Sequence, residues 1–400
     1  MLTRATIEIK VLVDEMLDKL PKEIWVSDTS TFLDPAMGGG QFVIEIERRL
    51  HEVGHSDENI SSRVFGYEKN ILVVNTVVSK NKLLGQYSVA DFLSKETNMK
   101  FDVVVGNPPF QDGNRKDEAS KLWPQFVKNS YEISADNGFI AMICPNNWMQ
   151  PTADIGKGDS KKSVNIFSDI FKKNNLLYAN IDSNNLQKTF FQGVGSTFSY
   201  FILQRCAYTG STTLLTEQGE IVIDISEIDC LPKITTQHSL SIMKKMTGVP
   251  FSFIDQNHRL NGDEQPEQTD EFKYKIFHTN KKNGTFWFGK KMSQYMNKPK
   301  VLISLSGIYK PIYDDSNGFS NMCLALPCST KSEAEHAVVV LSSKLYKFWV
   351  EMQKFSGFNP RKTILQLPAV NLNKLWSDED IFKEFGLTQD EIDYISENTK

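Results

Sequence analysis

The chain has 400 residues, of which 40% are hydrophobic, 11% aromatic and 24% charged, and its formal net charge is −4. This is the composition of an ordinary globular protein, which excludes a disordered or fibrous chain, and no run approaches the roughly 20 apolar residues of a membrane helix. At about 150 residues per domain, the length predicts two to three domains.

The predicted elements begin with a helix over residues 7–20, where apolar side chains recur at close to helical spacing. A short apolar run ends at Asp34 and is followed by three glycines and a helical pattern, which predicts a strand, a turn and a helix. Further strand-like runs cover 61–70, 100–110 and 138–148, and helical stretches cover 69–80 and 121–133. This alternation predicts an α/β domain with a mixed, mostly parallel sheet.

The second half of the chain has a different character from about residue 210 onward. Residues 255–271 are polar and acidic, which predicts an exposed loop or a mobile join. A strand at 300–307 and a helix at 332–353 follow. We therefore expect two domains, residues 1–210 and residues 211–400, the second of α+β type.

Positive charge is concentrated in one window of the second domain. Between Phe272 and Tyr313 there is no Asp or Glu, yet the stretch holds nine lysines interleaved with aromatic residues. Such a stripe can follow the phosphates of a nucleic acid. The other interpretation is a solvated lysine face over an aromatic core. The candidate DNA-binding lysines are Lys281, Lys282, Lys290 and Lys291.

Acidic residues end successive strands of the first domain. Asp34 opens the sequence DPAMGGG (34–40), in which glycines let the backbone approach a ligand at a helix N-terminus. Glu68 ends the next strand, where a carboxylate would accept both hydroxyls of a ribose. Asp91 ends the following segment and could accept from an adenine amino group. A glycine-rich turn alone is also found with nucleotides and flavins, or simply as a tight turn, but three such acids point to one ligand.

The most specific pattern is Asn107-Pro108-Pro109-Phe110, directly after the run FDVVVG. The Asn107 side-chain oxygen and the Pro108 carbonyl can accept the two N–H bonds of an exocyclic base amine and so free its lone pair. Consecutive prolines hold that carbonyl in place. Phe110 offers a flat face for an extruded base. The alternative is a proline-terminated strand with a core phenylalanine.

DPAMGGG, Glu68, Asp91 and NPPF, in that order, resemble a gamma-type adenine-N6 DNA methyltransferase of the kind common in restriction–modification systems. The resemblance covers residues 5–205 and implies a Rossmann-like domain that binds S-adenosylmethionine, with the first helix lining its methionine end. It implies that 211–400 is a target-recognition domain for double-stranded DNA. By position, the implied cofactor-binding residues are Asp34, Ala36, Gly38, Gly40, Glu68, Asp91, Phe92 and Asn107, and the implied catalytic residues are Asn107, Pro108, Phe110 and Phe191, with Phe190 as the alternative to Phe191.

Other functions share some of these residues. Ribosomal guanine-N2 methyltransferases also use NPPF and protein-glutamine methyltransferases use NPPY, but neither typically carries some two hundred residues after the catalytic domain. A non-catalytic DNA-binding module is the remaining alternative. The resemblance allows a separate cognate restriction endonuclease as a partner. The sequence has no zinc-site spacing and no nuclease constellation, its N-terminus does not resemble a signal peptide, and its five irregularly spaced cysteines fit a reducing compartment. We therefore expect a cytoplasmic protein without metal or membrane contact.

Overall fold

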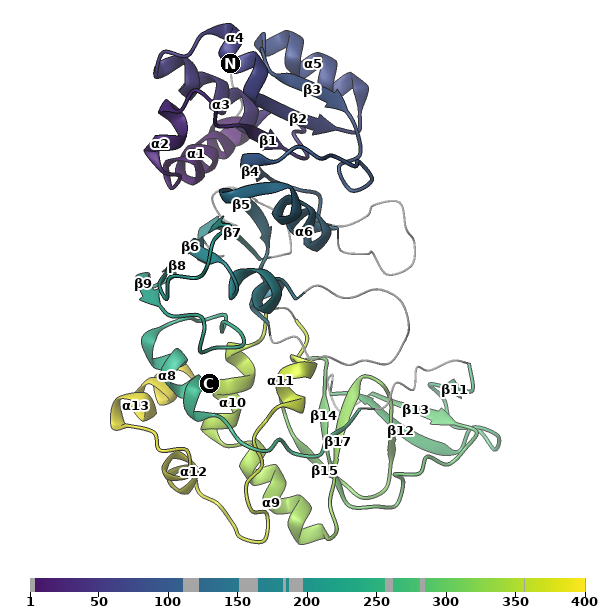
Figure 1. The fold of residues 1–400 in the computed structure, drawn as a ribbon. Helices are drawn as coiled ribbons and strands as arrows, with labels where there is room; N and C mark the ends of the chain where they lie inside the picture. Colours follow the sequence, from purple (N-terminus) through teal and green to yellow (C-terminus); the bar gives the residue numbers. More distant parts are fainter. Residues whose placement is uncertain are drawn as a thin grey trace. The chain divides into compact units, whose positions relative to one another are not determined.

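The computed structural model describes residues 4–110, 122–150, 165–182, 185–186, 197–255, 262–280, 285–355 and 357–399 (Figure 1). The chain folds as two compact units that divide between Cys230 and Leu231. The predicted boundary at residue 210 falls before this division. The reason is that two strands beyond residue 210, β8 (Thr212–Thr216) and β9 (Gly219–Ile223), continue the sheet of the first unit.

The first unit contains a nine-stranded sheet in the order β3-β2-β1-β4-β5-β7-β6-β8-β9. Strands β1 to β5 pair in parallel with one another, whereas β7 runs antiparallel to both β5 and β6. This mixed, mostly parallel sheet confirms the predicted α/β class. The other strands are β1 (Phe32–Asp34), β2 (Val64–Glu68), β3 (Gln86–Val89), β4 (Phe101–Gly106), β5 (Ser134–Pro145), β6 (Asn175–Asn180) and β7 (Phe198–Gln204).

The strand order reverses at β1, and this reversal determines where a ligand can bind. The chain adds β2 and β3 on one side of β1 and then returns to place β4 on its other side. The connections that follow β1 and β4 therefore leave the sheet in opposite directions, which opens a crevice at the carboxyl ends of these strands. Asp34 ends β1, Glu68 ends β2, and Asn107 directly follows β4.

The helices of the first unit bury one apolar face each against the sheet or one another. Leu12 and Met16 of α1 share a core with Phe42, Ile46 and Leu50 of α3. These helices are α1 (Arg4–Asp18), α2 (Lys22–Val26), α3 (Gln41–Glu52), α4 (Asp57–Arg63), α5 (Ile71–Asn81) and α6 (Trp123–Ile133), with a 3₁₀ turn at Asn146–Met149 and a π-helix at Ile166–Phe171.

The second unit combines two four-stranded sheets, β10-β17-β14-β15 and β11-β13-β12-β16, with six helices in its described part, which confirms the α+β prediction. Its strands are β10 (Ile254–Asp255), β11 (Glu264–Gln265), β12 (Tyr274–Thr279), β13 (Thr285–Gly289), β14 (Lys300–Ser304), β15 (Ile312–Asp314), β16 (Gly318–Phe319) and β17 (Cys323–Pro327). Its helices are α8 (Gln237–Lys245), α9 (Lys331–Leu341), α10 (Lys344–Met352), α11 (Arg361–Leu365), α12 (Asp378–Glu384) and α13 (Gln389–Asn398).

Three local predictions need correction. The strand expected over 61–70 starts only at Val64, because α4, capped by the Ser56 hydroxyl, extends through Arg63. The helix expected over 332–353 is two helices, because α9 ends at Leu341 with Ser342 as its C-cap and Ser343 is the N-cap of α10. The acidic stretch after Asp255 is not all loop, since Glu264 pairs into a sheet and is buried.

Candidate active site

Two cavities open at the carboxyl ends of β1, β2 and β4. The first, of about 210 Å³, lies between α1 and the glycine-rich loop, and we call it the α1 cavity; its walls include Ile9, Leu12, Val13, Asp34 and Phe42. The second, of about 320 Å³, is called the Phe92 cavity and is lined by Tyr67, Glu68, Lys69, Phe92, Pro109 and Phe126. Ala36 and Asn107 line both. The two cavities therefore adjoin at these two residues.

Asp34 is a buried carboxyl group in the wall of the α1 cavity, only 1% exposed. One of its oxygens accepts a hydrogen bond from the Ala36 N–H at 3.0 Å. Burial raises the pKa of Asp34 to about 7, with the Ala36 N–H opposing this shift and the Glu68 carboxylate adding to it. Gly106 allows the close approach of β4, because a Cβ there would lie 3.1 Å from the Asp34 Oδ1. At neutral pH Asp34 is thus poised to ionise next to a cation.

The glycine-rich loop turns the backbone from β1 into α3. Gly38 and Gly40 have φ of +47° and +79°, which L-residues with a side chain rarely adopt. The Gly38 N–H donates to the Glu68 carboxylate at 3.3 Å, and the second Glu68 oxygen accepts from the Asn70 N–H. Gly40 is the N-cap of α3. The loop, Glu68 and the first turn of α3 therefore form one hydrogen-bonded unit at the cavities.

Gly40 also has no space for a side chain, and this gives a testable result. A Cβ at Gly40 would overlap the Val77 Cγ1, whereas nothing lies within 4 Å of a Cβ at Gly54, which shares a positive φ of +96°. Both Gly40→Ala and Gly54→Ala incur backbone strain of about 1 kcal/mol, but only the first displaces α5. We expect urea unfolding to show Gly40→Ala as less stable than Gly54→Ala by a further 1–3 kcal/mol, roughly the usual cost of overpacking. Equal free energies of unfolding would contradict this packing.

Aromatic rings build the Phe92 cavity. Phe92 is buried, and its ring centroid lies 6.4 Å from that of Tyr67 and 5.4 Å from that of Phe126.

Asp91, the expected acceptor for an adenine amino group, forms an ion pair with Lys69 at 2.9 Å and accepts from the Leu93 N–H. Its neighbours Ala90 and Phe92 line the cavity. In this structure the Asp91 carboxylate therefore already has a cationic partner.

The residues of the NPPF sequence lie directly after β4. Asn107 is exposed and lines both cavities, whereas Pro108 is buried. Phe110 is half-buried, and its ring packs on Phe198 with centroids 5.1 Å apart. Part of the Phe110 ring thus packs in the core, as one interpretation of the sequence predicted, while the rest is open, as a stacking surface for a base would require. Phe191 and its alternative Phe190 lie outside the described residues.

Several cavity residues were not among the sequence candidates. Met37 lies within the glycine-rich sequence and Tyr67 immediately precedes Glu68. Both could have been predicted from the sequence by including every residue of the glycine-rich turn and the residue before Glu68. Ile143 reaches the α1 cavity from β5, and Phe126 reaches the Phe92 cavity from α6. Neither belongs to a recognisable motif, because only the tertiary fold brings them to the site.

The candidate DNA-binding lysines belong to the second unit. Lys290 pairs with Glu271 at 2.8 Å and lies over the ring of Phe272, while Lys291 is exposed. Lys281 and Lys282 lie outside the described residues. Lys300, another lysine of the window, is buried and pairs with Asp314 at 2.7 Å. Acids just beyond the two ends of the window therefore neutralise two of its lysines.

Within the described ranges, no three His, Cys, Asp or Glu side chains gather as metal ligands would. None of the helices in those ranges is both long and apolar enough to cross a membrane.

Sequence comparisons point to one family. Residues 42–175 match the family model of the Eco57I restriction-modification methylase. The type II methyltransferase M.CvrRI of Paramecium bursaria Chlorella virus XZ-6E is 26% identical over 186 residues, which cover 42% of this chain and 44% of that protein. An uncharacterized adenine-specific methylase of Mycoplasma pneumoniae is 28% identical over 140 residues, covering 30% and 32%. The chain thus spans less than half the length of the curated relatives that it matches.

A solved structure shares the fold across nearly the whole chain. It is a nuclease-deletion mutant of the Type ISP restriction–modification enzyme LlaGI in complex with a DNA substrate mimic, with a TM-score of 0.54 and 13% identity over 96% of this chain and 54% of that one. At this identity the likeness concerns the fold alone. The resemblance found in the sequence is confirmed by the family comparison instead, in which residues 42–175 match a restriction-modification methylase model.

Proposed function

We propose that this protein transfers the methyl group of S-adenosylmethionine to the exocyclic N6 amine of adenine in double-stranded DNA. The observation that carries the proposal is the position of Asn107, which lines both cavities at the point where the strand order reverses. A cofactor spanning the two cavities and a base amine that reaches Asn107 would meet at this residue. The matches to a type II methyltransferase and to an adenine-specific methylase support this chemistry.

The residues of the site fit S-adenosylmethionine. Its methionine part carries an ammonium and a sulfonium, and Asp34 is a buried carboxyl group that gains from a nearby positive charge. Its adenosine part needs an acceptor for ribose hydroxyls and an apolar slot for a purine, which Glu68 and Phe92 supply. Gly38 and Gly40 keep the loop backbone open beside the ligand. When bound, the cofactor supplies an electrophilic methyl group.

The chain's own residues prepare the attacking amine. The lone pair of an adenine N6 is delocalised into the ring, so the amine is a weak nucleophile. Asn107 Oδ1 and the Pro108 carbonyl accept its two N–H bonds, which favours tetrahedral geometry and localises the lone pair for in-line attack. The amine nitrogen would take the methyl group that the cofactor supplies, with the electron pair of the S–CH₃ bond remaining on the sulfur, and the acidic methylated amine would then lose a proton to water. No strong general base is required.

A flipped adenine needs surfaces on both ring faces. We propose the open part of the Phe110 ring for one face and Phe191 for the other. The target-recognition role is assigned to the C-terminal region, predicted at 211–400, with double-stranded DNA as its partner. A separate cognate restriction endonuclease is the further partner that the match to a restriction-modification methylase family suggests.

The lysine window supplies a test of the DNA contact. Replacing Lys281, Lys282, Lys290 and Lys291 with Gln should weaken duplex binding, and each lost phosphate contact should reduce the slope of log affinity against log salt by about 0.9. Lys290 already pairs with Glu271, so the exposed Lys291 should contribute more. Filter binding at several salt concentrations measures this. Lys383→Gln, an exposed position on α12, is the control, and a slope unchanged in the quadruple variant would place DNA recognition elsewhere.

Calorimetry combined with methyl transfer tests the proposal as a whole. We expect S-adenosylmethionine to bind the protein without DNA, and radiolabelled methyl groups to appear on duplex DNA that contains the recognition sequence. A protein that binds duplex DNA but not the cofactor would instead be the non-catalytic module.

A further inference from the structure

One wall of the α1 cavity is a helix that is held by charged contacts. Ile9, Leu12 and Val13 of α1 face the cavity, and the opposite wall is the first turn of α3 with Gln41 and Phe42. The volume of the cavity therefore depends on the distance between α1 and α3. Besides the apolar core that the two helices share, polar contacts on their other sides help to set this distance.

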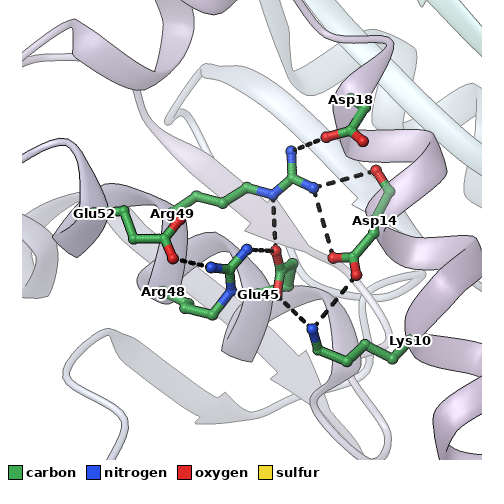
Figure 2. Close-up of polar contacts among 7 residues, drawn as sticks. All are labelled: Lys10, Asp14, Asp18, Glu45, Arg48, Arg49 and Glu52. Carbon is green, nitrogen blue, oxygen red and sulfur yellow. Dashed lines mark hydrogen bonds and ion pairs between the residues drawn. The ribbon is translucent and has the colours of Figure 1, made fainter.

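Arg49 of α3 makes most of these contacts (Figure 2). Its Nε donates to Glu45 Oε1 at 2.9 Å within α3. Its Nη1 pairs with the Asp18 carboxylate of α1 at 2.8 Å. Its Nη2 donates to the Asp14 carbonyl of α1 at 3.2 Å and lies 3.6 Å from Asp14 Oδ1. We call Arg49, Glu45, Asp14 and Asp18 the Arg49 clamp.

The electrostatics of the clamp make Arg49 essential to it. The Glu45 side chain is only 3% exposed. Burial would raise the pKa of Glu45, but hydrogen bonds from Arg48 and Arg49 outweigh burial and lower it to about 2. Burial and the Glu45 carboxylate raise the pKa of Asp14. Two carboxylates on opposite helices thus face each other, and Arg49 is the guanidinium that bridges them. Lys10 of α1 also lies 3.4 Å from Asp14 and 3.8 Å from Glu45. Without Arg49, Lys10 alone would bridge Asp14 and Glu45, and the α1 carboxylates would lose their guanidinium partner.

Two α1 residues with charged contacts to α3, Asp14 of the clamp and Lys10, are direct neighbours of cavity residues along the chain. Asp14 follows Val13, and consecutive Cα atoms are about 3.8 Å apart. Lys10, which lies 3.8 Å from Glu45, follows Ile9 in the same way. A loss of the clamp would therefore move the apolar wall of the cavity itself.

We propose that Arg49 is a positioning residue for the cofactor: by bridging Glu45 to Asp14 and Asp18 it holds α1 closed over the α1 cavity. The inference rests on the proposed function, because it takes S-adenosylmethionine as the ligand of that cavity. If α1 without Arg49 were closed only about a tenth of the time, the apparent affinity would fall about tenfold. The chemical step at Asn107 would be unaffected once the ligand is bound.

Arg49→Met and Arg48→Met form a matched pair for the test. Arg48 donates to Glu45 and Glu52, both on α3, so its loss removes two Glu45 hydrogen bonds while the bridge from Arg49 to α1 stays in place. We expect Arg49→Met to raise the KM for S-adenosylmethionine about tenfold with kcat within about twofold of wild type, and Arg48→Met to change neither by more than about twofold. Asp14→Asn added to Arg49→Met should restore part of the affinity, since it removes the carboxylate repulsion.

Hydrogen exchange of α1 gives a readout that needs no ligand. The amides of residues 9–18 should exchange faster in Arg49→Met than in Arg48→Met. A KM in Arg49→Met equal to that of Arg48→Met, or a loss confined to kcat, would overturn the role of the clamp. If Arg49→Met fails to fold, Arg49→Lys replaces it, because Lys keeps the positive charge but lacks the several N–H donors of the guanidinium group. This variant should show a smaller rise in KM, and an unchanged KM would also contradict the role of the clamp. Failure of wild type to bind S-adenosylmethionine would instead contradict the proposed function, while exchange would still decide whether Arg49 holds α1.

Discussion

Replacing Asn107 with Ala is expected to reduce methyl transfer by about a hundredfold or more while leaving S-adenosylmethionine affinity nearly unchanged. The Asn107 oxygen is proposed to accept an N–H bond of the target amine, and an acceptor that acts mainly in the transition state affects kcat rather than cofactor binding. The side chain is exposed where it lines both cavities, so its removal leaves no buried polar group behind. Single-turnover transfer and calorimetry with S-adenosylmethionine measure the two quantities separately.

Asn107→Asp is the matched control for this variant. The carboxylate keeps an oxygen acceptor at the same position, so we expect it to retain much more activity than Asn107→Ala. Wild-type turnover in Asn107→Ala would exclude the proposed mechanism. A large loss of cofactor affinity in both variants would instead make Asn107 primarily a cofactor ligand.

Replacing Asp34 with Asn is expected to stabilise the ligand-free protein at pH 8 and to weaken cofactor binding at least tenfold. The pKa of Asp34 is raised to about 7 from its ordinary 3.8, first by burial and then by Glu68. At a pH between these two pKa values, Asp34 keeps its proton in the folded protein but releases it in the unfolded chain. The free energy of unfolding therefore falls as pH rises from about 4 to about 7. Asn cannot ionise and avoids this loss, which for a shift of about three pKa units at 1.36 kcal/mol per unit is of the order of 4 kcal/mol.

The geometry of Asp34→Asn is conservative, because an Asn oxygen can still accept from the Ala36 N–H. Urea unfolding at pH 4 and pH 8 measures the stability difference, which should be near zero at pH 4 and should favour the variant at pH 8. Calorimetry at pH 8 measures the affinity for S-adenosylmethionine. A variant that is less stable at pH 8, or that binds the cofactor as wild type does, would contradict the view that Asp34 is kept as a charge partner for a cationic ligand.

The placement of the candidate residues at one edge of the sheet follows from local sequence. Strands that end in a polar residue bring Asp34, Glu68 and Asn107 to one edge of a parallel sheet, because parallel strands share the orientation of their carboxyl ends. The turn after Asp34 is equally local, since the positive φ at Gly38 and Gly40 favours glycine. These features need only short stretches of chain to be recognised.

Features that depend on distant partners were not predictable in the same way. Phe126 enters the Phe92 cavity from a helix without a motif, and β8 extends the sheet by pairing with β6. Lys300 is one of the nine lysines of the window, but it is buried, and Asp314 on the paired strand β15 neutralises it. The clamp at Arg49 likewise joins two helices whose contact the sequence pattern did not indicate.

A map of modified bases is the most direct measurement. The chain would be expressed in a host that lacks DNA methylation, and its DNA would be read by single-molecule sequencing alongside a strain that expresses Asn107→Ala. We expect N6-methyladenine at one recurring sequence throughout the genome with the wild-type chain and its absence with the variant. Folded wild-type protein that leaves every adenine unmodified, or that methylates guanine in ribosomal RNA instead, would contradict the proposed function.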